Sequence, residues 1–192
     1  MKKNLFNLAF ALVIGTAVTA STPVEEVTKP VKTDKSTVTW KGYKVTGSHT
    51  GTIDLQSGAL SFDGDKLVGG EFVVNMATLI STDLEGEYKG KLEGHLKSDD
   101  FFGVESHPTS KLVFTEITAT GKNSYEVSGD LTIKGITKAI TFDVSVYGSK
   151  ATATMKVDRS QFDVRYGSGS FFDNLGDKTI YDEFDLVVDL EF

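Results

Sequence analysis

The sequence contains no cysteine in 192 residues, and it has only three histidines and one tryptophan. The absence of cysteine excludes disulfide bonds, thiolate nucleophiles and thiolate metal sites together. It also excludes a lipoprotein, because there is no thiol to acylate. The fold must therefore be held by burial of side chains without covalent support.

Histidine is too sparse and too scattered for a metal site. No two of His49, His95 and His107 have the i,i+4 helical or i,i+2 strand spacing that ligands favour. Asp99 and Asp100 are adjacent carboxylates, but sequence neighbours point apart, and the local pattern explains them as helix caps. A nucleophile elbow, a phosphate-binding loop and a dinucleotide fingerprint are also missing. The sequence predicts no catalytic residue, no metal, no cofactor and no enzyme.

Positive charge is in short supply, with 20 lysines and arginines against 27 acidic residues and a formal net charge of −7. Removal of Lys2 and Lys3 with a signal peptide would lower it by two, to −9. Such a charge opposes binding to nucleic acid or to anionic lipid surfaces. We expect no nucleic acid partner, and a lipid ligand would have to be held by its apolar tail.

The apolar run over residues 5–18 is too short to be an ordinary membrane span. It contains about 14 residues before Thr19, whereas a spanning helix needs about 20. Lys2 and Lys3 precede it, and Val18-Thr19-Ala20 supplies small residues for a signal peptidase. The pattern predicts a signal peptide over residues 1–20, a periplasmic or secreted protein, and no stable membrane insertion after cleavage; an uncleaved anchor is the alternative.

The remaining chain reads as one domain with a short leader. Residues 21–35 mix Pro, Glu, Lys and Thr without apolar periodicity, which predicts a flexible leader. Residues 36–192 fit a single globular domain, since 39% of the chain is hydrophobic. The oligomeric state is open, and a homodimer is one possibility.

What the chain has in abundance is alternation of apolar and polar residues, most regularly over residues 125–146. Apolar residues occupy odd positions before Lys134-Gly135 and even positions after it, which predicts a long β-hairpin with one apolar face. Arms of this length suit a barrel wall. We expect a loop over residues 134–137 and a register that pairs Tyr125 with Val146, Val127 with Val144, and Leu131 with Ile140.

Seven further segments show the same alternation. Gly42 interrupts the first of them, as a β-bulge would, and turns are expected at residues 56–58 and 63–65. Nine strand segments with hairpin-length connections predict an all-β, up-and-down antiparallel barrel, closed by pairing of the last strand with an early one. The further segments are residues 37–45, 51–55, 59–63, 69–76, 110–118, 150–157 and 179–192.

The period changes to four residues between positions 84 and 102. Leu84, Tyr88, Leu92 and Leu96 recur in helical register, and residues 81–83 offer an N-cap. Glycines at 86, 90 and 94 each weaken a helix by about 1 kcal/mol, which favours one broken helix. On one face, these glycines would instead allow close approach to the barrel rim.

Several motifs of this sequence resemble those of the YceI-like family of exported bacterial proteins. They are GHLKSDDFFGVESHPTSKLVF (94–114), GDLTIKGITKAITF (129–142), SHTG (48–51) and DRSQF (158–162). The resemblance covers residues 36–192. It implies an elongated, lipocalin-like antiparallel β-barrel of about eight strands with a short helical segment at one end. It also implies an apolar lumen that binds a polyisoprenoid or another long-chain lipid.

The alternating apolar faces would then line this lumen. An eight-stranded interior is wide enough either to be filled by side chains or to hold one slim ligand, so a carrier and a structural or stress-related protein with a filled core both stay open. An enzyme on the same barrel would need acid and base groups converging at its mouth. The predicted lumen residues are Trp40, Phe72, Val74, Phe114, Val127, Leu131, Phe142, Val144, Met155, Phe184 and Leu186, with Phe101 and Phe102 at the mouth.

Cleavage of the signal peptide is directly testable. Protein exported by its own host should begin at Ser21, because the small residues before this position satisfy the peptidase. The intact mass of the exported protein measures this. A mass that retains residues 1–20 would contradict the soluble, exported form.

Overall fold

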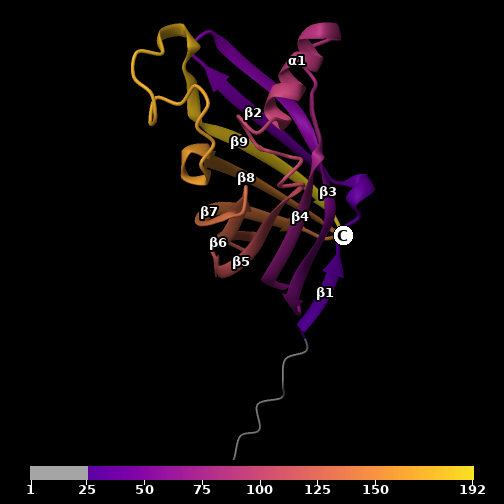
Figure 1. Cartoon of the computed structure of the whole chain (residues 1–192). Helices are drawn as coiled ribbons and strands as arrows, with labels where there is room; N and C mark the ends of the chain where they lie inside the picture. Colours follow the sequence, from indigo (N-terminus) through magenta and orange to yellow (C-terminus); the bar gives the residue numbers. More distant parts are fainter. Residues whose placement is uncertain (1–25) are drawn as a thin grey trace, which may run out of the picture.

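The structure, a computed structural model, describes residues 26–192. Nine strands form one antiparallel sheet in the order β1-β3-β2-β9-β8-β7-β6-β5-β4, and β3 also pairs with β4. This second pairing closes strands β2 to β9 into an eight-stranded barrel, to which β1 is added along β3 (Figure 1). The all-β barrel with a short helix is confirmed, as is the pairing of the last strand, β9, with an early one, β2.

The strands are long, as the alternation predicts. Their bounds are β1 Glu26–Pro30, β2 Thr37–Lys44, β3 Gly47–Asp63, β4 Lys66–Ser81, β5 Thr109–Ala119, β6 Ser124–Ile133, β7 Ile136–Tyr147, β8 Lys150–Asp158 and β9 Ile180–Glu191; the helix α1 is Gly86–Lys97, and short 3-10 turns cover Thr33–Lys35, Arg159–Phe162 and Gly176–Lys178.

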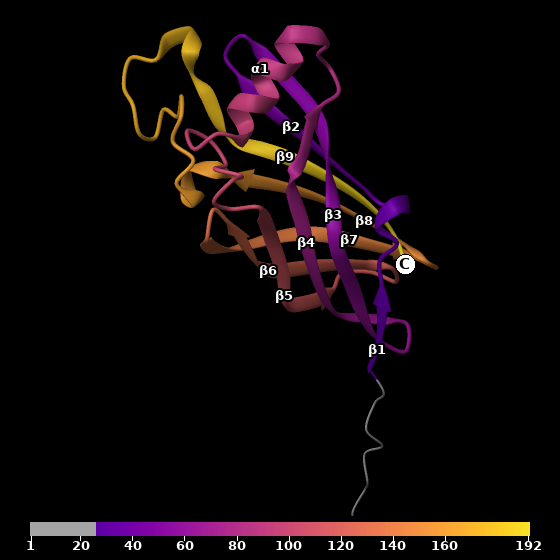
Figure 2. The same ribbon diagram turned by 45° about the vertical axis from the view of Figure 1, so that its right-hand side comes forward.

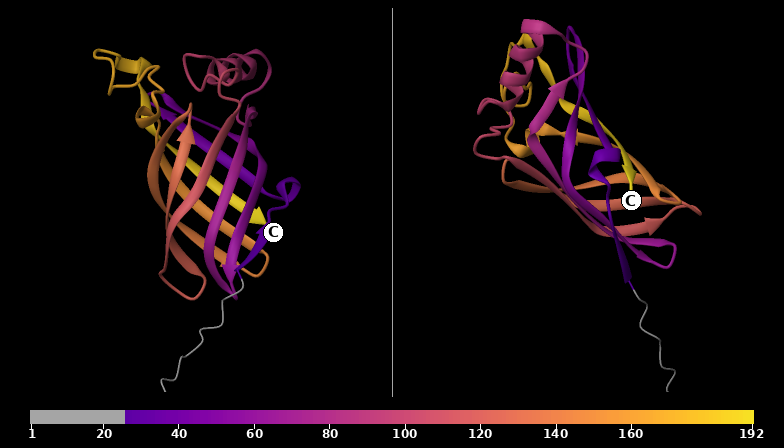
Figure 3. Two further views of the ribbon diagram at one scale, coloured as in Figure 1. Left: turned by 60° about the horizontal axis from the view of Figure 1, so that its bottom comes forward. Right: turned by 90° about the vertical axis from the view of Figure 1, so that its right-hand side faces the viewer.

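The barrel has two dissimilar ends (Figure 3). One end, called here the helix end, carries α1 and the β8–β9 loop (residues 159–179). The opposite end, called the far end, carries the tight β3–β4 and β7–β8 turns and the C-terminus. The long insertions of the chain therefore all gather at one end of the barrel.

The β6–β7 hairpin exists, but its predicted register is wrong by two residues. Tyr125 lies opposite Val144 instead of Val146, and Val127 lies opposite Phe142 instead of Val144. The loop is shorter than expected because Lys134 and Gly135 alone make the turn, with φ of 51° and 74°. Positive φ at both positions is typical of a type I′ turn, whose twist matches that of the strands. A shift of two residues keeps every side chain on its predicted face.

The turn predicted at residues 56–58 is also wrong. The segments predicted as residues 51–55 and 59–63 are parts of one strand, β3, whose pairing with β4 shifts between Leu55 and Ser57. Gly58 lies under the Phe72 ring, which a Cβ atom would meet at 2.6 Å. The polar and glycine residues therefore mark a bulge that bends a continuous strand. The bulge expected near Gly42 is confirmed by a register shift between Gly42 and Lys44.

Residues 26–35 are ordered, in contrast to the flexible leader predicted over residues 21–35. β1 pairs with β3 throughout, and Val31 is buried with its amide donating to Gly58 O. Lys32 forms an ion pair of 3.1 Å with Glu191. The pairing was not predicted because an edge strand of five residues carries little apolar periodicity. The predicted signal peptide and residues 21–25 lie outside the described residues.

The helix is shorter than residues 84–102 and begins differently. Glu85 is its N-cap and makes no side-chain cap hydrogen bond, so the predicted cap at residues 81–83 is wrong. A Cβ atom at Gly90 or Gly94 would meet nothing within 4 Å, which rules out the close approach to the rim. Leu92 and Leu96 pack against the core, whereas Tyr88 is 75% exposed. Figure 2 shows α1 beyond the end of β4.

Two glycine substitutions test the type I′ turn between β6 and β7 and the open face of α1. Gly135 has a positive φ, whereas Gly90 lies within the helix. Gly135→Ala should lower the free energy of unfolding by about 1 kcal/mol, because an L-residue at positive φ is strained. Gly90→Ala, on an open helix face, should raise it by about the same amount. Urea unfolding of both variants measures the difference. Equal effects of the same sign would contradict the type I′ turn.

Candidate functional site

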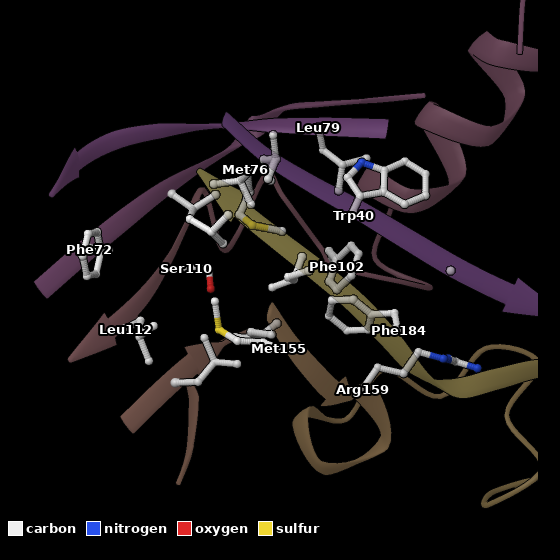
Figure 4. A pocket seen from close by; sticks show the side chains of 18 of the residues that line it. Trp40, Phe72, Met76, Leu79, Phe102, Ser110, Leu112, Met155, Arg159 and Phe184 are labelled. Carbon is white, nitrogen blue, oxygen red and sulfur yellow. The ribbon is translucent and has the colours of Figure 1, made fainter. Parts of the chain in front are cut away.

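An elongated cavity of about 380 Å³ occupies the barrel interior. Its lining on β9 runs from Ile180 to Leu190, ten steps of about 3.3 Å, or roughly 33 Å along the strand. The other barrel strands and α1 also contribute lining residues. In Figure 4, Trp40, Met155 and Phe184 point from different strands into this one space. The cavity is thus long and narrow, and its lining is almost wholly apolar.

Twelve of the thirteen predicted lumen residues line this cavity. They come from strands on all sides of the barrel and from the segment between α1 and β5, where the paired phenylalanines lie. The twelve are Trp40, Phe72, Val74, Phe101, Phe102, Phe114, Leu131, Phe142, Val144, Met155, Phe184 and Leu186. Whether they contact a ligand stays a prediction.

Val127 is the exception, and its placement in the lumen is wrong. It is completely buried and does not line the cavity. Depth in the barrel does not separate it from the lining, since Val127 pairs with the lining residue Phe142, and Val144, which also lines the cavity, pairs with Tyr125 nearer to the far end. Close packing is found at that end as well: the Tyr125 hydroxyl accepts a hydrogen bond of 3.3 Å from the Leu67 amide, and Phe62 stacks on Phe192 at 5.4 Å. The barrel thus combines packed side chains with an open lumen, whose lining on β9 extends to Leu190.

Many lining residues were not predicted. For those on β3 and β4, the bulges change which parity faces inward, so the face could not be followed along these two strands. Those on the other strands share the parity of predicted lumen residues but were not singled out. The unpredicted lining residues include Val38, Ile53, Leu55, Leu60, Met76, Leu79, Leu96, Leu112, Ile133, Val188 and Leu190.

Polar lining residues concentrate at the helix end. Tyr166 and Tyr181 are about half exposed, at 48% and 52%, so the cavity reaches solvent there. Elsewhere the polar lining is satisfied within the protein, as where Ser110 Oγ donates to Thr132 O at 2.8 Å. The residues of this polar end are Tyr43, Lys44, His49, His95, Arg159, Tyr166 and Tyr181.

Arg159 is the most deeply buried charge of this end, being 2% exposed. Its guanidinium donates to the carbonyl oxygens of Tyr181, Val164 and Ile180 at 3.2, 2.8 and 3.0 Å. Asp182 lies 3.4 Å from Nη2. Burial lowers the pKa of Arg159, and Asp182 opposes this effect; an arginine stays charged nonetheless. Arg159 is thus occupied in fastening the β8–β9 loop to the barrel.

His49 and Asp83 form the second polar contact of the helix end. His49 Nδ1 lies 2.9 Å from Asp83 Oδ2. Burial alone would raise the pKa of Asp83, but hydrogen bonds from Ser81 and His49 outweigh it and lower the pKa. The pair ties the start of β3 to the segment before α1. Among residues 26–192, no three His, Asp or Glu side chains are grouped as metal ligands would be.

The two adjacent aspartates after α1 are not part of the cavity. Asp99 and Asp100 are exposed and do not line the cavity; Ser98, not either aspartate, is the C-cap of α1. Within the described range, no helix combines the length and the hydropathy needed to cross a membrane.

A closed antiparallel barrel around an elongated apolar cavity, open at one end, is the architecture of lipocalin-like binding proteins. The comparison with known families makes this specific. Residues 30–192 match the YceI-like domain. The chain therefore belongs to the YceI-like family, which confirms the resemblance of its motifs.

Relatives by sequence are proteins described as UPF0312. The chain is 29% identical over 150 residues to the one from Shewanella denitrificans, a match that spans 77% of this chain and 75% of that protein. It is 31% identical over 98 residues to the one from Azotobacter vinelandii, and this match spans 51% and 49% of the two chains. The second match thus spans about half the length of the curated relative.

Solved structures share the fold. BcnA of Burkholderia cenocepacia superposes with a TM-score of 0.65 at 23% identity, covering 83% of this chain and 98% of BcnA. A polyisoprenoid binding domain from Saccharophagus degradans gives a TM-score of 0.60 at 14% identity, covering 84% and 95%. At these identities the likeness concerns the fold.

A matched pair of tryptophan substitutions tests which inward-facing positions of the β6–β7 hairpin border the cavity. Val144→Trp places its indole in the cavity, so the lipid-free protein should melt near the wild-type temperature. Val127→Trp forces the same volume into a fully buried position that does not line the cavity, and it should cost about 1 to 3 kcal/mol or more. Thermal melts of delipidated protein measure both. A similar large loss for Val144→Trp would contradict a lumen at this position.

Proposed function

We propose that this protein is an exported bacterial carrier that holds a long-chain lipid of the isoprenoid type in its barrel. The observation that carries the proposal is the cavity itself. It is apolar over most of its length, it is far longer than it is wide, and it reaches solvent at the helix end. Such a space fits one extended hydrocarbon chain, with the chain's polar end toward α1.

The energetics support retention without a charged anchor. Each buried CH₂ group contributes about 0.8 kcal/mol, so about ten such groups supply the roughly 8 kcal/mol of micromolar binding before ordering costs are subtracted. A chain of several isoprene units has more than this number. Burial of the apolar tail alone thus supplies enough free energy to hold the lipid. The net negative charge of the protein would not attract an anionic head group, so binding through the tail fits this charge.

An isoprenoid suits the lining better than a uniformly thin chain. The Phe114 ring contacts both Phe72 and Phe142 along the wall. Met76 and Met155 add flexible thioethers, which adapt to irregular shapes such as branched chains. The family membership and the polyisoprenoid-binding neighbour from Saccharophagus degradans agree with this ligand class.

Binding accounts for the helix end better than catalysis does. Arg159 donates to three carbonyl oxygens and lies beside Asp182, and His49 is paired with Asp83, so these charged groups are engaged in holding loops. A periplasmic or secreted location follows from the predicted signal peptide, and it is part of the proposal. The proposal also includes that the protein has no nucleic acid partner and does not insert stably into a membrane. A homodimer would be compatible with lipid binding in each barrel.

Native mass spectrometry of protein purified from its own host tests the carrier. The spectrum should show one bound lipid per chain that organic extraction removes, and re-addition of lipid should raise the melting temperature, since a ligand that binds only the folded state stabilises it. Val144→Trp is the control with a blocked lumen and should lack the adduct. A lipid-free spectrum under gentle conditions, or an identical adduct in the blocked variant, would reject the proposal.

A further inference from the structure

His95 is a polar side chain in an apolar place. It projects from the last turn of α1 and lines the cavity. Its Nε2 atom is buried, and it has no hydrogen-bond partner among residues 26–192. A buried polar atom left without a partner costs about 1 to 3 kcal/mol, so an unpaired ring nitrogen at this position marks a place where a partner is missing.

Aromatic rings enclose this histidine. The Tyr166 ring lies 4.3 Å from it in an edge-to-face arrangement, and the Phe101 ring lies at 5.7 Å. Phe101 is buried, so it is fixed, whereas Tyr166 is 48% exposed on the β8–β9 loop. Gly167, at a φ of 63°, follows it directly. Tyr166 is therefore the one of the two rings that can move aside and uncover Nε2 to the cavity.

The remaining groups of the helix end restrict what would bind there. Three carbonyl oxygens and Asp182 already surround the Arg159 guanidinium, so it has little capacity for a phosphate. Lys44 is the other basic side chain of this end besides Arg159 and the histidines, and it lies at the rim, at the end of β2. The ring nitrogen of a histidine can donate to or accept from a hydroxyl, or donate to a carbonyl.

We propose that His95 Nε2 is the hydrogen-bonding partner for an uncharged polar head, a hydroxyl or carbonyl group, at the end of the bound chain. Tyr166 covers this site in the empty protein and gives way when the head enters. The inference rests on the proposed lipid carriage. It adds a residue that recognises the polar head of the ligand by a hydrogen bond. The apolar lumen provides affinity, and His95 provides discrimination between head groups.

The test compares three probes that share one isoprenoid tail: geranylgeraniol, the hydrocarbon lacking its hydroxyl, and geranylgeranyl phosphate. Delipidated wild-type protein should bind the alcohol about tenfold more tightly than the hydrocarbon, as expected for one buried hydrogen bond. His95→Leu should bind both with equal affinity, whereas His95→Gln, which can still hydrogen-bond, should keep part of the preference. Circular dichroism confirms that each variant is folded.

His107→Leu is the matched control. His107 lies at the same end of the barrel, near Gly135, but does not line the cavity, so this variant should keep the tenfold preference. Tyr166→Ala should keep the preference too, while geranylgeraniol associates faster because the cover is gone. An unchanged association rate would overturn the role of Tyr166.

Three outcomes would overturn the role of His95, and they separate it from the carrier function. Tight binding of alcohol and hydrocarbon with equal affinity in the wild type would remove the head site but leave the carrier intact. Preference for the phosphate, lost in Lys44→Gln but not in His95→Leu, would assign the head to Lys44. Binding of none of the three probes, with no lipid in the protein from its host, would reject both proposals.

Discussion

Closure of the β-sheet is the constraint on which everything else in this protein depends. The chain has no cysteine, so the barrel exists only because β9 pairs with β2 and β3 pairs with β4, which leaves no open edge in the ring of eight strands. The 17 residues of β3 make the second join, since residues 51–63 pair with β4 along one edge, while residues 47–53 pair with β2 and residues 59–63 with β1 along the other. Bulges bend β3 as it passes from one neighbour to the next.

The interior of the closed ring differs between its two ends. At the far end, Tyr125, Phe62 and Leu67 are buried, and short turns join the strands. At the helix end, α1 and the β8–β9 loop replace short turns, and the lining becomes polar. The buried Arg159 holds that loop in place through three backbone carbonyl oxygens and an ion pair with Asp182. A long apolar cavity with one polar, solvent-connected end is the result, and this asymmetry is what orients a chain-like ligand.

Particular residues show how far the pattern of the sequence reaches. Alternation identified the β6–β7 hairpin and ten lumen residues on the strands, because each side chain's face depends only on parity, which a register shift of two preserves. The same reasoning misplaced Val127, because parity tells that a side chain points inward but not whether it borders open space or packed side chains. It also divided β3 in two at Gly58, where a bulge and a turn have the same composition. The isolated β1 carried no periodic signal at all.

The sequence by itself determined the fold class, the inward-facing residues of the regular strands and the family, because these follow from local alternation and from motifs contiguous in the chain. Only the tertiary structure decided where the barrel is solid and where it is hollow. The position of the cavity depends on which side chains of the eight strands lie beside one another inside the barrel, and strand register and bulges set this arrangement. It also decided that the Tyr166 ring packs against His95, since these residues are 71 positions apart in the chain and meet only because the closed barrel brings α1 and the β8–β9 loop to the same end.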